Sequence, residues 1–401
     1  MHHVTDKDGL HRETLILGEG AVLCDRRLDT PINPPVYLST AFCVDTLDEL
    51  QELHKAQGYS YIRTRNPNRN MLSEMISYLE GGEQSLVFSS GMAAITTAIS
   101  AHVKAGDHIL ADDTLYGETM QFIEDVMPSY GVEITMTDFT NIENVKANIR
   151  PNTKVVFSEV VTNPTIKVID VAAVAEIAHS AGACYIVDNT FTTSFVIKPL
   201  DLGADIAVNS LTKFANGHSD VCAGAATGNA KAMDRIWQRQ KLAGGILDPF
   251  SAYLCQRGMR TMDVRLERQC KNAAALAKAL ESCPYVEKVL HPSLASHPQK
   301  ATALKQFKGD VCGAMLSFYM PENWQKINEF MTKLRVPHYA MTLGGYRTSL
   351  SYPIISSHSG VSKEEREALG ITDGLMRISV GMENTEDLVN DFLQALNVFG
   401  R

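Results

Sequence analysis

The sequence contains no run of about 18 apolar residues and no pair of cysteines in a C-x-x-C arrangement. The first absence excludes a transmembrane helix, and the second leaves no compact set of zinc ligands and no disulfide framework. Basic residues are outnumbered, 37 against 46 acidic residues, which gives a formal net charge of −9. Such a chain lacks the basic surface that nucleic acids and anionic membranes require, so we expect neither as a partner.

The eight cysteines are scattered along the chain, and several lie in apolar segments of strand-like character. The first residues, Met1 to Asp8, lack the apolar core of a signal peptide. Both features favour a cytoplasmic location, where thiols stay reduced and buried.

At 401 residues with 45% hydrophobic content, the chain is long enough for one large domain and a smaller one. Residues 1–60 have little periodicity and contain a proline-rich segment, 30–36, that cannot form a regular helix or a central strand. We predict an extended N-terminal arm that lies on the body of the protein or on a neighbouring subunit. Residues 61–255 are predicted to form the large domain, and residues 256–401 the small one.

Short runs rich in β-branched residues alternate with helical segments after the arm. This alternation predicts an α/β fold with a parallel sheet covered by helices on both faces, in which ligands bind at the carboxyl ends of the strands. Beyond residue 255, an amphipathic helix at 263–281 and alternating strands at 314–318 and 376–380 predict a smaller α+β domain. The six strands predicted for the large sheet are 85–88, 108–110, 132–135, 154–157, 184–187 and 206–208.

The segment Ser89-Ser-Gly-Met92 follows the first of these strands and begins a helix. Backbone N–H groups at such a helix start suit a phosphate, although an ordinary helix cap explains the same residues. The segment lacks the patterns G-x-G-x-x-G and G-x-x-x-x-G-K-[ST], so sites for dinucleotides and nucleoside triphosphates are disfavoured.

Three further side chains follow other strands, and each has an ordinary explanation when taken alone. Taken alone, Asp188 is explained as a turn residue or helix cap, Tyr116 as an amphipathic aromatic residue, and Lys213 as a solvated surface charge. Together with a phosphate site, they are the groups that hold pyridoxal phosphate. The lysine forms the imine and the acid keeps the ring nitrogen protonated, whereas an NAD site needs no such lysine.

Short motifs occur in a characteristic order along the chain: Pro31-Ile-Asn-Pro-Pro-Val36, Tyr61-Ile-Arg63, Asn66-Pro67, Ser89-Ser-Gly-Met92, Leu115-Tyr-Gly117, Asn163-Pro-Thr165, Asp188-Asn-Thr-Phe191, and the segments 210–220 and 377–383. By these motifs the chain resembles the pyridoxal-phosphate enzymes of cysteine and methionine metabolism, which include methionine γ-lyase, cystathionine γ-lyase and cystathionine γ-synthase. The resemblance implies the aspartate-aminotransferase-like fold, known as fold type I, with a mixed, mostly parallel sheet. It also implies a homotetramer built from two tight dimers.

The resemblance assigns a role to each candidate site residue. It places the cofactor imine on Lys213, the contact with the ring nitrogen on Asp188 and the stacking aromatic ring on Tyr116. Asn163 approaches the cofactor ring from the side, and Arg377 binds the substrate carboxylate beside the loop that contains Ser349. The phosphate is held by residues from two subunits: Gly91, Met92, Ser210 and Thr212 from one, and Tyr61 and Arg63 from its partner.

The activity implied is α,γ-elimination from methionine, cystathionine, homocysteine or a related amino acid, with a 2-oxo acid, ammonia and a thiol as products. Two other reactions fit the same residues, namely γ-replacement, as in cystathionine γ-synthase or a homoserine-ester sulfhydrylase, and elimination of a non-sulfur γ-substituent. A cofactor-binding regulator without turnover is the alternative from another class. It is disfavoured because the residues needed for turnover are all present: Tyr116, Asp188, Lys213 and Arg377.

Departures from the family pattern concern the substrate more than the cofactor. Glu118 stands where methionine γ-lyases usually have a cysteine, and its carboxylate either favours an amino-bearing substrate side chain or points to solvent. Asn68 and Gln240 also replace the usual residues, and the segment 346–349 is one residue longer than usual. We expect these changes to surround the substrate.

Overall fold

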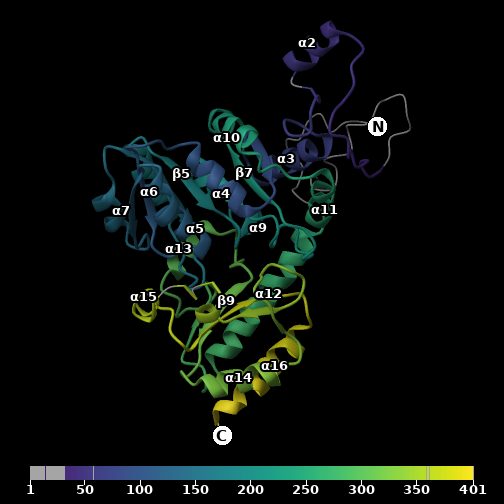
Figure 1. Ribbon diagram of the computed structural model, residues 1–401. Coiled ribbons are helices and arrows are strands. Elements are labelled where there is room, and N and C mark those ends of the chain that lie inside the picture. Colours follow the sequence, from purple (N-terminus) through teal and green to yellow (C-terminus); the bar gives the residue numbers. More distant parts are fainter. Residues whose placement is uncertain (1–13, 15–31, 57, 358, 361, 401) are drawn as a thin grey trace.

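Two β-sheets make up the body of the protein, and the long helix α12 (Met262–Glu281) leads from the larger sheet to the smaller one (Figure 1). The computed structural model describes residue 14 and residues 32–56, 58–357, 359–360 and 362–400. The first half of the predicted arm therefore lies almost entirely outside the described residues.

The larger sheet has seven strands in the order β1-β7-β6-β5-β4-β2-β3. Strand β7 is antiparallel to both of its neighbours, while the other neighbouring strands pair in parallel. This arrangement confirms the α/β fold with a mixed, mostly parallel sheet. The strands are β1 Gln84–Phe88, β2 His108–Asp112, β3 Glu133–Thr137, β4 Thr153–Glu159, β5 Cys184–Asp188, β6 Ile206–Asn209 and β7 Gly224–Gly228.

Strand β7 is missing from the predicted strands because four of its five residues are glycine or alanine. Close packing requires the small residues: a Cβ atom on Gly224 would lie 2.2 Å from the carbonyl oxygen of Ser90. The glycine allows the start of helix α4 (Gly91–Ser100) to approach the strand directly. Strand β7 thus supports the beginning of helix α4.

The central strands are apolar along most of their length because helices cover both faces of the sheet. Neighbouring residues such as Val155 and Val156 are fully buried in separate cores on opposite faces. One core includes α4 and α10 (Ala230–Ala243), and the other includes α3 (Pro67–Glu80) and α8 (Val171–Ser180). Burial on both faces explains why continuous apolar runs mark these strands.

The smaller sheet has five strands in the order β10-β11-β12-β9-β8. Its strands are β8 Lys288–Leu290, β9 Met315–Tyr319, β10 His338–Tyr339, β11 Ser349–Ser351 and β12 Leu375–Ser379. Helices α12, α14 (Trp324–Lys333) and α16 (Thr385–Leu396) share a third apolar core with it. The other α-helices of the described residues are α2 Leu47–Lys55, α5 Gly117–Gln121, α6 Met127–Ser129, α7 Ile142–Asn148, α9 Thr193–Val196, α11 Pro249–Met259, α13 Lys300–Gln306 and α15 Lys363–Ala368.

None of the helices formed by the described residues combines the length and the apolar character needed to cross a membrane. The seven cysteines that the structure describes are all free. Four of them are buried as predicted, whereas Cys43 and Cys222 are exposed. The cytoplasmic location stays a prediction.

The turn that carries Lys213 follows β6 and is held by Arg265 of α12. The Arg265 guanidinium donates hydrogen bonds of 3.0 Å to the carbonyl oxygens of Phe214, Ala215 and Gly258. Its side chain is 3% exposed. The helix that joins the two sheets therefore also fixes the backbone beside the candidate lysine.

Replacing Arg265 by methionine leaves three buried carbonyl oxygens without their donor, which costs about 1 kcal/mol or more for each. We expect the Arg265→Met variant to melt several degrees below the wild-type protein in differential scanning calorimetry. Arg257→Met, which changes an exposed arginine on α11, is the matched control and should shift the melting temperature by less than about 1 °C. Equal melting temperatures for the two variants would contradict the proposed support of the turn.

Candidate active site

A cavity of about 300 Å³ lies at the carboxyl ends of β4, β5 and β6, and β12 of the smaller sheet contributes to its wall. The predicted site residues come from segments that are far apart in the sequence, yet most of them meet here. Ten of the thirteen line the cavity: Gly91, Met92, Tyr116, Glu118, Asn163, Asp188, Ser210, Thr212, Lys213 and Arg377.

The start of helix α4 forms one end of the cavity, beside Ser210. The Ser90 hydroxyl accepts a hydrogen bond of 3.0 Å from the Ala93 amide, whereas the amides of Gly91 and Met92 have no partner within the helix. A Cβ atom on Gly91 would lie 2.8 Å from Cβ of Ser210, so only glycine lets the two segments meet. Free amides at the positive end of a helix, next to a hydroxyl, fit a phosphate group.

Two carboxylates lie side by side at the ends of neighbouring strands. Asp188 of β5 and Glu159 of β4 are partners in register, and burial raises the pKa of Asp188 to about 6. Burial, together with repulsion from Asp188, also raises the pKa of Glu159 well above its usual value. The ion pairs of the described residues include neither carboxylate. A ligand with a protonated ring nitrogen next to Asp188 fits this excess of negative charge.

Glu159 is a site residue that the sequence reasoning missed. Its two carboxylate oxygens accept hydrogen bonds from the backbone amides of Tyr116, at 2.7 Å, and Asn163, at 3.1 Å. One buried side chain therefore holds two of the predicted residues in place. The signal that singled out Asp188, a carboxylate at the end of an apolar strand, is also present at Glu159.

Lys213 and Arg377 bring two positive charges to the cavity. Burial and repulsion from Arg377 lower the pKa of Lys213, so a larger share of its amine is neutral than in an exposed lysine. The Arg377 side chain is 5% exposed, donates to Oδ1 of Asn163 at 2.8 Å, and has no hydrogen-bond partner at Nε. No carboxylate of the described residues forms an ion pair with it, so this arginine suits the carboxylate of a ligand.

Tyr116 is followed directly by helix α5, which begins at Gly117 and contains Glu118. Burial raises the pKa of Tyr116, and the negative charge of Glu118 and its hydrogen bond with the phenol raise it further. The phenol therefore stays protonated and has a proton to donate. The structure thus brings a protonated phenol and a lysine of lowered pKa to one cavity.

Three predicted residues do not line the cavity. The Ser349 hydroxyl donates to a backbone carbonyl oxygen at 3.3 Å, and Ser351, the last residue of β11, faces the cavity instead. Tyr61 is 47% exposed, and Arg63 donates to a backbone carbonyl oxygen at 2.7 Å. Both are predicted to act in the site of a partner subunit, and this role stays a prediction.

The family departures do not all surround the cavity. Glu118 lines it, whereas the Gln240 amide donates a hydrogen bond of 2.7 Å to the carbonyl oxygen of Val87 in β1. The Asn68 amide donates to the Pro35 carbonyl oxygen and so holds the arm. The expectation that the departures surround the substrate is therefore wrong for Gln240 and Asn68. Thr212 lines the cavity as predicted, but its hydroxyl donates to a backbone carbonyl oxygen of the segment before β7.

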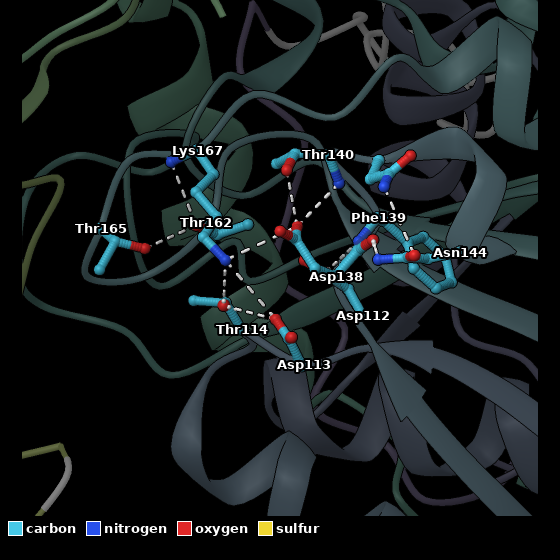
Figure 2. Close-up of polar contacts among 11 residues, drawn as sticks. Asp112, Asp113, Thr114, Asp138, Phe139, Thr140, Asn144, Thr162, Thr165 and Lys167 are labelled. Carbon is cyan, nitrogen blue, oxygen red and sulfur yellow. Dashed lines mark hydrogen bonds and ion pairs between the residues drawn. The ribbon is translucent and has the colours of Figure 1, made fainter. Parts of the chain in front are cut away.

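A partly exposed ionic group supports the turn that carries Tyr116. Figure 2 shows the ammonium group of Lys167 next to Thr114, Asp113 and Asp138. The Lys167 nitrogen lies 3.6 Å from Asp113 and 3.7 Å from Asp138, and it donates to the Thr114 hydroxyl at 3.0 Å. Lys167 belongs to the loop after β4, so this group joins that loop to the turn before Tyr116. Since the acidic side chains have an ammonium group among them, they require no metal ion.

Proteins with this sheet topology and with a lysine at the strand ends, opposite a phosphate-binding helix start, are pyridoxal-phosphate enzymes of fold type I. Comparison with known proteins narrows the class. The model of the family described as Cys/Met metabolism PLP-dependent enzyme matches residues 23–397, and the chain belongs to this family. The resemblance drawn from the motifs and the dependence on pyridoxal phosphate are thereby confirmed.

Individual relatives cover most of the chain. It is 40% identical over 371 residues to an L-methionine gamma-lyase of Fusobacterium nucleatum subsp. polymorphum, which covers 90% of this chain and 92% of the relative. It is also 40% identical over 365 residues to the cystathionine gamma-lyase of Bos taurus, with coverage of 90% and 88%. A solved structure of cystathionine gamma synthase from Xanthomonas oryzae pv. oryzae, in complex with aminoacrylate and cysteine, has a TM-score of 0.92 at 32% identity, over 98% of this chain and 99% of that one. The enzyme is therefore related to lyases and to a synthase of the same family.

Asp112, at the end of β2, provides a test of the buried charge behind the site. It is fully buried, its Oδ2 atom has no hydrogen-bond partner, and burial raises its pKa to about 8. The folded protein holds a proton on Asp112 that the unfolded chain releases near pH 4, so the contribution of this group to stability falls as the pH rises from about 4 to about 8.

The amide of Asp112→Asn does not ionise. We therefore expect the melting temperature of this variant, relative to that of the wild-type protein, to be higher at about pH 9 than at about pH 6. Melting curves at both pH values measure this gain. Asp234→Asn removes an exposed carboxylate and is the control, for which the difference from wild type should be the same at both pH values. A pH-independent difference for Asp112→Asn would refute the assignment of a buried proton.

Proposed function

We propose that the protein catalyses α,γ-elimination from amino acids that carry a sulfur-bearing substituent on the γ-carbon. The observation that carries this proposal is the meeting of three groups in one cavity: Lys213 with a lowered pKa, protonated Tyr116, and Arg377 without a counter-ion. The relatives described as methionine gamma-lyase and cystathionine gamma-lyase support the same reaction. The reaction consumes one water molecule and releases a thiol, ammonia and 2-oxobutanoate.

Arg377 is proposed to bind the α-carboxylate of the substrate. Its guanidinium group can offer two parallel N–H donors, which match a carboxylate. Its position is fixed through Asn163, whose backbone amide is in turn held by Glu159. This chain of contacts joins the smaller sheet to the larger one, so it sets the orientation of the bound amino acid relative to Lys213.

Lys213 and Tyr116 are proposed to transfer the protons. Pyridoxal phosphate, when bound, supplies an electron sink for the charge that develops at the α-carbon. The Lys213 amine removes the α-proton, and a second proton then leaves the β-carbon. The Tyr116 phenol donates its proton to the sulfur as the bond between the γ-carbon and sulfur breaks. The pKa shifts of the two groups, one lowered and one raised, suit a base and an acid in the same site.

The remaining residues of the cavity are proposed to hold the cofactor. Asp188 pairs with the protonated ring nitrogen, and Asn163 approaches the ring from the side. The amides of Gly91 and Met92 bind the phosphate with the Ser210 hydroxyl. The Thr212 hydroxyl donates a hydrogen bond to the carbonyl oxygen of Ala223. It can donate to the phosphate only after it turns away from this oxygen.

The second candidate function is γ-replacement, in which a thiol or sulfide takes the place of the leaving group. The similarity to the solved structure described as cystathionine gamma synthase favours it. The residues proposed for proton transfer serve both reactions, so the choice depends on whether water or a thiol completes the reaction. A regulator without turnover has no support from the cavity, because Lys213, Tyr116 and Arg377 all face it.

We propose that the described part of the arm, residues 32–56 and 58–60, covers a second copy of the chain in a homotetramer. Figure 1 shows α2 away from both sheets, and this helix buries none of its residues. Three apolar side chains of the arm are largely exposed: Ile32 at 87%, Leu38 at 69% and Leu47 at 79%. Exposed apolar surface of this kind is typical of an interface. In that assembly Tyr61 and Arg63 would reach the partner's phosphate site.

A substrate panel tests the reaction. Methionine, cystathionine, homocysteine and O-acetylhomoserine are incubated separately with the holoenzyme, and the 2-oxo acid, ammonia and thiol are quantified. We expect 2-oxobutanoate and ammonia in equal amounts from at least one of the three sulfur compounds. Formation of acetate together with cystathionine or homocysteine from O-acetylhomoserine and added cysteine or sulfide, with no 2-oxobutanoate from the three sulfur compounds, would instead establish γ-replacement.

The role of Lys213 is tested by substitution with alanine. We expect Lys213→Ala to lose the absorbance band that pyridoxal phosphate acquires when it is bound covalently to a lysine, and to lose at least about 1,000-fold in kcat. Lys271→Ala changes an exposed lysine on α12 and should keep both the band and the activity. An unchanged spectrum in Lys213→Ala would refute the assignment.

A further inference from the structure

Glu118 lies at the beginning of α5 and lines the same cavity as Lys213 and Arg377. Its carboxylate is hydrogen-bonded to the Tyr116 phenol. The residue as a whole is exposed, so Glu118 lies toward the open side of the cavity, whereas Asp188 and Glu159 end strands inside the fold.

The other charged groups of the cavity each have a function in the proposed reaction or in its support. Arg377 serves the α-carboxylate, Lys213 the cofactor and the proton, and Asp188 the ring nitrogen. Glu159 is engaged by two backbone amides. Glu118 is different, because the ion pairs of the described residues do not include it and its hydrogen bond to Tyr116 comes from a neutral group.

Lys213 is a cation that acts on Glu118, since the two charges attract each other across the cavity. A covalent bond between Lys213 and the cofactor would take that ammonium group away. Glu118 would then face the substrate without the positive charge of Lys213. A carboxylate in this position binds a cation well and gains nothing from a methylthio group.

The wall beside Glu118 is also rich in hydrogen-bond acceptors. A Cβ atom on Gly117 would lie 2.6 Å from the carbonyl oxygen of Ser357, so α5 begins directly against the segment that contains Ser356 and Ser357. These two serines line the cavity together with Ser351, whose hydroxyl lies 2.8 Å from that of Ser356. Hydroxyl and carbonyl oxygens next to a carboxylate suit a group with several N–H donors, such as an ammonium group.

We propose that Glu118 binds a protonated amine on the γ-substituent, so that the enzyme prefers γ-thioether amino acids whose leaving group ends in an ammonium group. This inference rests on the proposed γ-elimination and adds the class of substrate. Among the substrates named above, the leaving group of cystathionine carries an ammonium group, next to a carboxylate, and that of methionine carries none. A charge-assisted hydrogen bond at a partly open site corresponds to a preference of about tenfold over a neutral group of equal length.

The test compares two substrates that differ only at the end of the substituent. S-(2-aminoethyl)-L-homocysteine ends in an ammonium group and S-propyl-L-homocysteine in a methyl group, with the same number of heavy atoms. Both give 2-oxobutanoate and ammonia, with 2-aminoethanethiol or propanethiol as the thiol. The ratio of their kcat/KM values for the holoenzyme is measured from the release of 2-oxobutanoate.

The variant is Glu118→Gln, whose amide oxygen still accepts the hydrogen bond from Tyr116 but carries no charge. Asp125→Asn removes an exposed carboxylate from the next turns of the same segment and is the matched control. We expect a ratio of about 10 in the wild-type enzyme and in Asp125→Asn, and a ratio near 1 in Glu118→Gln, mainly through the KM of the aminoethyl substrate.

Three results would overturn the inference, and each points to a different error. A ratio near 1 in the wild-type enzyme shows that Glu118 does not select the amine. An equal loss of kcat for both substrates in Glu118→Gln shows that Glu118 acts on the reaction through Tyr116 alone. Absence of 2-oxobutanoate from both substrates, and from methionine and cystathionine, refutes the proposed function itself.

Discussion

The site depends on the burial of two carboxylates, Glu159 and Asp188, that end neighbouring parallel strands level with each other. Glu159 is stabilised by two backbone amides, and these hydrogen bonds fix Tyr116 and Asn163. Asp188 faces the cavity, and its raised pKa reports the cost of a negative charge there. A cationic ring nitrogen removes that cost, so the place proposed for the cofactor follows from a charge that the fold leaves without a counter-ion.

Close backbone contacts keep the two sheets in position around this charge. A Cβ atom on Gly344, in the loop before β11, would lie 2.4 Å from the amide nitrogen of Phe214. A Cβ atom on Gly217 would lie 1.7 Å from the Arg265 guanidinium, and its φ of +70° also favours glycine. The turn of Lys213 is thereby enclosed between the two sheets, which places the lysine and Arg377 of β12 in one cavity.

The sequence predicted the parts of the site that follow strands with strong local signals, such as Asp188 and Lys213. It missed β7, because glycine and alanine carry no strand signal of their own and are needed here for close packing. It selected Ser349 where the structure places Ser351 in the cavity. The two residues share one face of β11, so the position along the strand, which only the folded chain decides, determines which of them reaches the cavity. Glu159 carried the same signal as Asp188 but was overlooked.

The sequence by itself determined the α/β fold and the cofactor, because apolar runs, glycine-bearing turns and short motifs are local features. Only the tertiary structure decided which side chains share the cavity. Asn163 meets Arg377 across 214 residues of sequence, and Glu118 lies toward the open side of the cavity near Tyr116 and Lys213. These contacts depend on how two sheets close against each other, which no local pattern encodes. The lowered pKa of Lys213 has the same origin, because burial and the charge of a neighbour exist only in the folded chain.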